Sequence, residues 1–424
     1  MFFKLIIATI LTGLISGFFI TFYEFLIIFL SHYIFMGDPL KTIPTLPIWY
    51  IYFVPITAMF LVNYIVSKDK AIREYGVSEI AESVTENRMI LSIKALFLKV
   101  IASALSLSSG FSVGTEGPSA GIGAMIAYQI HKLFRLPVIL VKVMIGVGAS
   151  SGIAAIFGTP ITGIAFAIEH IAYQFFKQYI GYVILSSVIA FAVASQYLEI
   201  ITFQHSIGRK IQYNYIVPIL LFIPFITLFI YFYLFMKKVL LHFIDLKVFK
   251  TLPKYRNHIF ALLGGSVIGT ILLIEPHAGF SGKEVVMHLM NNEEHIPLIL
   301  IFMIILLRIV GTTISIYSNA VGGVFLPLMS IGALVGYGFG ELLILVHNFP
   351  IEPFYFAAIG ASVFMGVLMK LPLTAVVLSL ETTFDYNVVI ATGICVVLVN
   401  WLSNLYFDIK KSYSTKADKV QRVE

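Results

Sequence analysis

The chain has 424 residues, of which 59% are hydrophobic and 12% are charged, and its mean hydropathy is +0.95. Because an ordinary soluble domain carries about 25% charged residues, this composition indicates a polytopic protein of the lipid bilayer and excludes a soluble globular domain. The net charge of +6 is not gathered into a basic patch with interleaved aromatic residues, so nucleic acid is not an expected partner.

Apolar runs long enough to cross a bilayer, about 20 residues each, recur along the whole chain. The first run is too long for the core of a cleaved signal peptide, so we expect it to be a retained helix. The expected spans are approximately 5–35, 48–66, 90–112, 118–134, 138–158, 160–203, 214–245, 258–275, 297–317, 326–349, 353–383 and 387–407. The polar stretches between them are expected to be loops or interfacial segments: 67–89, 204–213, 246–257 and 276–296.

The last residues, 408–424, form a short basic tail. Positive charge favours the cytoplasmic side of a membrane. We therefore expect an integral, multi-pass protein of the plasma (inner) membrane with both termini in the cytoplasm, and no cytosolic regulatory domain. The single cysteine, Cys395, excludes an intramolecular disulfide.

The chain contains an internal duplication. The segment Lys99–Ser106 (KVIASALS) matches Arg308–Ser315 (RIVGTTIS), 209 positions later. The same offset, or one of 212, pairs Gly114 with Gly323, Pro118 with Pro327, Gly123 with Gly332, Gly148 with Gly360, Pro160 with Pro372, Thr162 with Thr374 and Glu169 with Glu381. We therefore expect one all-α transmembrane domain made of two inverted repeats with broken helices, about 36–203 and 214–407.

Two repeated elements, Gly114-Thr115-Glu116-Gly117-Pro118 and Gly323-Val324-Phe325-Leu326-Pro327, are predicted to be helix starts, because proline is favoured in a first turn. Helix N-termini attract anions, and paired half-helices often face the substrate of a transporter. The sequence thus predicts an anion site where Glu116 is either a competing charge or a simple helix cap. Lys99 and Arg308 could increase the positive potential at this site. Alternatively, their side chains could extend to the membrane surface or form structural ion pairs.

These two elements resemble the GxEGP and GxFxP motifs of the CLC family of chloride channels and chloride/proton antiporters. Phe157-Gly158-Thr159-Pro160 and Leu380-Glu381-Thr382-Thr383 also fit that family, and the resemblance extends from about residue 71 to Tyr413. It implies a pore for chloride or a similar small monovalent anion within each subunit of a homodimer, and no enzyme activity or cofactor.

The resemblance assigns roles to particular residues. Glu116 would be the gating glutamate, which blocks the anion path when ionised and leaves it when protonated. The backbone N–H groups of Val324 and Phe325 would hold the central anion, and the Tyr413 hydroxyl would face it.

Two positions depart from the family pattern. The GSGIP segment aligns with Tyr75-Gly76-Val77-Ser78, so Tyr75 replaces the serine that usually contacts the anion, and the Gly76 amide could serve alone. This leaves open whether chloride, fluoride or nitrate is preferred. At the inner proton-transfer position of the antiporters stands His170, which is the candidate proton relay because histidine titrates near neutral pH. Coupled exchange and a passive channel therefore both remain possible.

Two other classes of membrane protein share single features with this sequence. Gly279-Phe280-Ser281-Gly282 resembles the GxSG element of rhomboid intramembrane proteases, but such a protease would leave the duplication unexplained. A sodium-coupled amino-acid transporter would also have broken helices, but Glu116 would repel a substrate carboxylate. The histidines show no metal-ligand spacing, so no metal site is expected.

Overall fold

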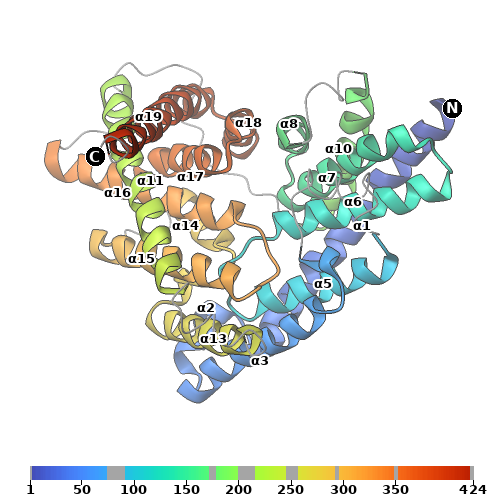
Figure 1. The fold of residues 1–424 in the computed structure, drawn as a ribbon, viewed down its shortest axis with the longest axis horizontal. Coiled ribbons are helices and arrows are strands. Elements are labelled where there is room, and N and C mark those ends of the chain that lie inside the picture. The colour runs from blue at the N-terminus through green and yellow to red at the C-terminus, as the bar shows by residue number, and fades with distance from the viewer. Residues whose placement is uncertain are drawn as a thin grey trace.

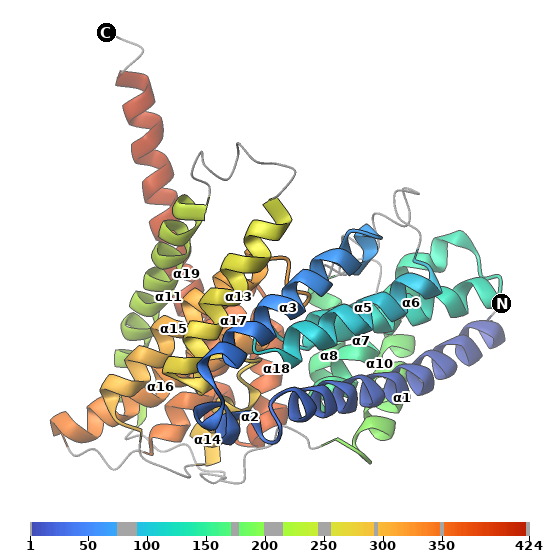
Figure 2. The ribbon, with the colours of Figure 1, turned by 90° about the horizontal axis from the view of Figure 1, so that it is seen from below.

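The computed structural model of the chain describes residues 2–73, 91–170, 178–198, 215–244, 256–291, 296–347 and 352–420, and these residues are almost entirely helical (Figures 1 and 2). The helices are α1 (Phe2–Ile34), α2 (Pro39–Thr42), α3 (Ile48–Val66), α5 (Ile93–Ser108), α6 (Glu116–Leu133), α7 (Val141–Phe157), α8 (Pro160–His170), α10 (Ile180–Ala194), α11 (Ile216–Ile244), α13 (Arg256–Ile274), α14 (Lys283–Asn291), α15 (Leu298–Tyr317), α16 (Phe325–His347), α17 (Pro353–Met369), α18 (Pro372–Thr383) and α19 (Tyr386–Val420). Short 3-10 turns cover Ile43–Thr45, Lys70–Ile72, Val138–Leu140 and Pro276–Ala278.

Eight helical segments in the described part of the chain are long and apolar enough to cross a membrane. They are Phe2–Thr45, Ile48–Val66, Val138–Phe157, Ile216–Phe243, Asn257–Ile274, Leu298–Tyr317, Phe325–Val346 and Tyr386–Asn404. Large apolar side chains on the outer helices are exposed, as lipid contact requires, for example Leu228 and Phe235 on α11. The prediction of an all-α, polytopic membrane protein is confirmed.

Two long apolar runs are broken, as their Gly-Pro elements indicate. The run 160–203 contains α8 and α10, and the run 353–383 contains α17 and α18. The helix before Pro160 ends on Gly158 at φ +67°, and the helix before Pro372 ends on Lys370 at φ +59°. Left-handed residues of this kind end a helix because they turn the backbone out of the helical path.

One of the polar stretches contains a short helix. Residues 276–296, which were expected to be a loop or an interfacial segment, include the nine-residue helix α14. Its stability comes from packing, because Val285, Val286 and Leu289 are buried on one face. The helix is short and carries lysine, glutamate and histidine on its other face. The mean hydropathy of the stretch is therefore too low to suggest a membrane-spanning helix.

Each half contains a tightly packed helix hairpin, α6 with α7 and α16 with α17. A Cβ added at Gly123 would lie 2.0 Å from the carbonyl oxygen of Gly148, and one added at Gly332 would lie 2.2 Å from that of Gly360. Only glycine permits helices to approach so closely. The glycines that the duplication pairs therefore serve the same packing in both halves.

The two halves exchange equivalent contacts. The Ser106 hydroxyl accepts a hydrogen bond from the Val321 N–H at 3.0 Å, and the Ser315 hydroxyl accepts one from the Ser112 N–H at 3.1 Å. Both members of each bond are related by the offset of 209 positions. Reciprocal contacts of this kind indicate an approximate two-fold axis between the halves. In Figure 1 the helices α6, α7, α8 and α10 gather on one side of this axis and α11, α16, α17 and α19 on the other.

Candidate functional site

The two Gly-x-x-x-Pro elements meet at the centre of the molecule. The Gly114 N–H donates to the Gly323 carbonyl oxygen at 2.7 Å, and the Gly323 N–H donates to the Gly114 carbonyl oxygen at 2.8 Å. These bonds hold the start of α6 against the start of α16, and the two helices run in different directions from there (Figure 2). The predicted convergence of the two helix starts is confirmed.

The Glu116 carboxylate lies at this junction and is 3% exposed. Its Oε1 accepts a hydrogen bond of 2.7 Å from the Phe325 N–H, at the first residue of α16. We expected the carboxylate to lie at the start of its own helix, near Pro118. Instead α6 begins at Glu116 itself, and the bonded oxygen turns to the helix start of the opposite half. This contact crosses the axis between the halves and could not be read from local sequence.

The carboxylate fits only because two glycines leave room for it. A Cβ added at Gly114 would lie 2.0 Å from Glu116 Oε2, and one added at Gly323 would lie 2.2 Å from Oε1. The first residue of each element must therefore be glycine, because any side chain there would overlap the carboxylate. Oε2 is buried and has no hydrogen-bond partner among the described residues.

The Phe325 side chain fixes the helix start that Glu116 contacts. It is fully buried, and its ring lies 5.0 Å from the ring of Phe157, measured between centroids. Phe157 is the last residue of α7 in the first half. The N–H that binds Glu116 is thus held in position by an aromatic contact between the halves.

The structure describes only some of the other predicted site residues. Val324 directly precedes α16 and is half-buried. Tyr75 and Gly76 lie outside the described residues. The backbones of His170 and Tyr413 belong to α8 and α19, whereas their side chains lie outside the described part of the chain.

Lys99 and Arg308 occupy equivalent positions in the two repeats, and both are fully buried. The Lys99 ammonium donates to the Ile72 carbonyl oxygen at 3.0 Å. The Arg308 Nη2 donates to the carbonyl oxygens of His277 and Gly279 at 2.9 and 3.0 Å. Among the described residues Arg308 has no ion-pair partner, so the structural ion pair that we considered for it is not formed there.

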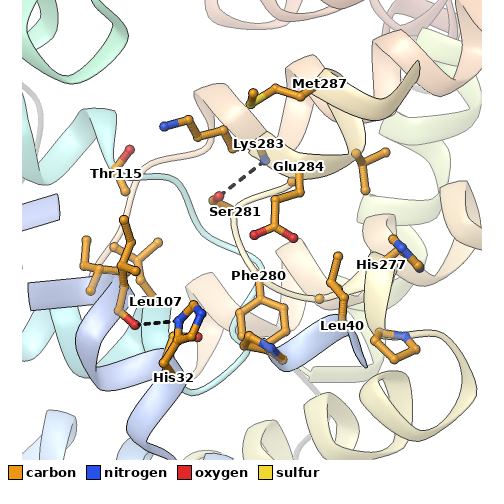
Figure 3. A pocket seen from close by; sticks show the side chains of 18 of the residues that line it. His32, Leu40, Leu107, Thr115, His277, Phe280, Ser281, Lys283, Glu284 and Met287 are labelled. Carbon is orange, nitrogen blue, oxygen red and sulfur yellow. Dashed lines mark hydrogen bonds between the residues drawn. The ribbon is translucent and has the colours of Figure 1, made fainter. Parts of the chain in front are cut away.

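The sequence did not predict a cavity of about 340 Å³ beside Thr115 (Figure 3). Its wall includes Thr115, the residue before Glu116, together with Lys283, Glu284 and Arg308. The only sequence signal for it was the polar stretch 276–296, which interrupts the apolar runs. No group of three or more potential metal ligands occurs among the described residues.

Comparisons with known proteins identify the family of this chain. Residues 54–404 match the family described as "Voltage gated chloride channel". The H(+)/Cl(-) exchange transporter ClcA of Vibrio vulnificus strain YJ016 is 26% identical over 389 residues, which are 90% of this chain and 82% of that protein. ClcA of Salmonella arizonae is 27% identical over 337 residues, 74% of this chain and 67% of that protein.

Two solved structures share the fold. A slow cyanobacterial Cl-/H+ antiporter superposes with a TM-score of 0.82 at 21% identity, with 95% of each chain covered. A CLC-type fluoride/proton antiporter superposes with a TM-score of 0.73 at 20% identity, again with 95% of each chain covered. With the family match extending over most of the chain, this protein belongs to the voltage gated chloride channel family.

Proposed function

We propose that the protein transports chloride, or a similar small monovalent anion, across the membrane in exchange for protons, with Glu116 as the gate. The observation that carries this proposal is the hydrogen bond from the Phe325 N–H to the Glu116 carboxylate. A helix start with an inward-facing N–H is a binding site for an anion. Glu116 occupies such a site in this structure, so a transported anion must compete with it.

The proposed gating follows from the two oxygens of Glu116. Oε1 accepts the Phe325 N–H, whereas Oε2 accepts no hydrogen bond from the described residues. Oε2 is therefore the oxygen available to an incoming proton. Protonation removes the negative charge, weakens the attachment to the helix start and lets an anion take the N–H group.

Several parts of the proposal rest on the family pattern. Val324, Phe325, Tyr413 and the segment Tyr75–Gly76 would line the anion path, and His170 would relay the proton. A homodimer in the plasma membrane with cytoplasmic termini is the assembly that we propose. Relatives that are named H(+)/Cl(-) exchange transporters support the coupled reaction over passive flow.

Chloride efflux from proteoliposomes, recorded together with external pH, tests the proposal. We expect chloride leaving down its gradient to drive protons into the liposomes. Chloride efflux without proton movement would favour a passive channel, and efflux of fluoride or nitrate in place of chloride would reassign the substrate. If none of these anions moved, transport itself would be contradicted.

A further inference from the structure

The cavity beside Thr115 lies where an anion would approach the gate. It is lined by the end of α1, by α2, by the turn before α14 and by Arg308 of α15. Figure 2 shows α2 and α14 at the end of the molecule opposite the C-terminus. With the C-terminus in the cytoplasm, as proposed above, the cavity opens on the outer side of the membrane.

Arg308 lines this cavity, and two nitrogens of its guanidinium lack hydrogen-bond acceptors among the described residues. Its side chain is fully buried, and Nη2 is the only nitrogen of its guanidinium that donates to a partner within the described residues. Nε and Nη1 are buried without any hydrogen-bond partner there. Because a guanidinium carries five N–H donors and burial without partners is costly, these two nitrogens require an acceptor that the described chain does not supply.

The start of α14 adds a second source of positive potential at the same place. Gly282 directly precedes this helix at φ +85°, and a Cβ added there would lie 2.6 Å from Arg308 Nη1. The guanidinium therefore touches the backbone at the helix start, where N–H groups lack intrahelical partners. Of these, the Lys283 N–H donates to the Ser281 hydroxyl at 3.3 Å (Figure 3).

No acidic side chain that lines the cavity forms an ion pair with Arg308 among the described residues. The Glu24 carboxylate pairs with the Lys283 ammonium at 3.4 Å, so these two charges offset one another. Partial burial raises the pKa of Glu284, and this exposed residue forms no ion pair with Arg308. His277 pairs with Glu275 at 2.6 Å. Arg308 is thus a buried cation without an ion pair among the described groups that line the cavity.

We propose that the Arg308 guanidinium and the start of α14 form an outer binding site for a small monovalent inorganic anion, separate from the site that Glu116 occupies. Nε and Nη1 of Arg308 and the first N–H groups of α14 donate to the anion. From there the anion passes Thr115 to reach the gate. This inference rests on the proposed transport function and adds to it a loading step on the outer side.

Bromide in crystals of the full chain, located by its anomalous scattering, tests the site directly. We expect a bromide peak in the cavity beside Arg308 of the parent protein, and its loss in Arg308→Met. Lys99→Met, which removes the equivalent buried cation of the other half, is the matched control and should keep the peak. An empty cavity in the parent, or a peak that persists in Arg308→Met, would overturn the inference.

Gly282→Ala is a second variant, in case Arg308→Met does not fold. Its Cβ would displace Nη1 from the start of α14, so the bromide peak should weaken although the charge is kept. An undiminished peak in a folded Gly282→Ala protein would contradict the proposed geometry.

Transport measurements distinguish this inference from the proposed function. Loss of charged hydrogen bonds predicts that Arg308→Met needs roughly 10-fold more external anion for half-maximal exchange, without a change on the inner side. If Arg308→Met transports anions and needs the same external anion concentration as the parent for half-maximal exchange, only the outer site would be refuted. A parent protein that transports no anion would refute the proposed function itself, whereas the bromide experiment would still report on the site.

Discussion

Glu169 and Glu381 each bind the start of the helix that carries the other. Glu381, on α18, accepts hydrogen bonds from the Ile161 N–H at 2.8 Å and from the N–H and hydroxyl of Thr162 at 2.6 and 2.7 Å. Glu169, on α8, accepts the equivalent bonds from Leu373 and Thr374 at 2.7, 2.8 and 2.6 Å. The two glutamates and their four partner residues are all related by the offset of 212 positions. The two carboxylates therefore connect the halves. Glu116 differs from both, because its Oε2 is buried without a hydrogen-bond partner among the described residues.

The first prediction concerns Glu116→Gln. The amide is nearly the size of the carboxylate and mimics its protonated form, and its oxygen can still accept the Phe325 N–H. Anion flux should persist, become nearly independent of pH and lose any coupled proton movement, because no charge remains to be titrated. Flux and pH recordings on proteoliposomes between pH 5 and 8 measure both effects.

Glu381→Gln is the control for that experiment, because Glu381 is also a buried acid at a helix start. It should retain the parent's pH dependence and proton coupling. If Glu116→Gln behaved like Glu381→Gln, Glu116 would be only a structural contact between the halves.

The second prediction concerns stability. Glu169→Gln and Glu381→Gln should each lower the free energy of unfolding by roughly 1–3 kcal/mol, because each removes charge-assisted bonds at a helix start. The thermal unfolding midpoint in detergent measures this loss. The two losses should be similar, given the matched contacts. A loss in one variant alone would contradict the symmetry that we infer.

The third prediction concerns the helix hairpins. Gly123→Ala and Gly332→Ala should destabilise the protein by roughly 1–3 kcal/mol or more, because the added methyl groups would overlap a backbone carbonyl. Gly181→Ala on α10 is the matched control, since a Cβ there meets nothing within 4 Å. That variant should be neutral or gain up to about 1 kcal/mol from helix propensity. Equal unfolding midpoints for the three variants would show that the helices of each hairpin leave room for a methyl group.

The fourth prediction concerns the proton route. His170→Ala should abolish proton movement while anion flux continues, if His170 is the inner relay in place of a carboxylate. The same liposome recordings of chloride and pH measure this. Unchanged proton movement would assign the relay to another residue.

The duplication made the central arrangement predictable, because residues paired by a constant offset must occupy equivalent places. It correctly predicted that Glu116 and Phe325 share one site. The direction of the Glu116 carboxylate was not predictable, since it depends on a backbone N–H 209 positions away and on the space beside Gly323. The helix α14 and its contact with Arg308 were missed for a similar reason. Their stability comes from tertiary packing, which leaves little trace in local hydropathy.

The backbone pairing of Gly114 with Gly323 bears on the speed of transport. Separating the two helix starts would break two short hydrogen bonds between the halves. Rocking of whole bundles, the usual route in transporters built from repeats, takes microseconds to milliseconds. A single carboxylate that changes its rotamer can move on a picosecond to nanosecond timescale when it is free to do so. With the backbone fixed in this way, the turnover rate should depend on how quickly a proton and an anion arrive. The backbone around Glu116 should keep the same conformation at every stage of the cycle.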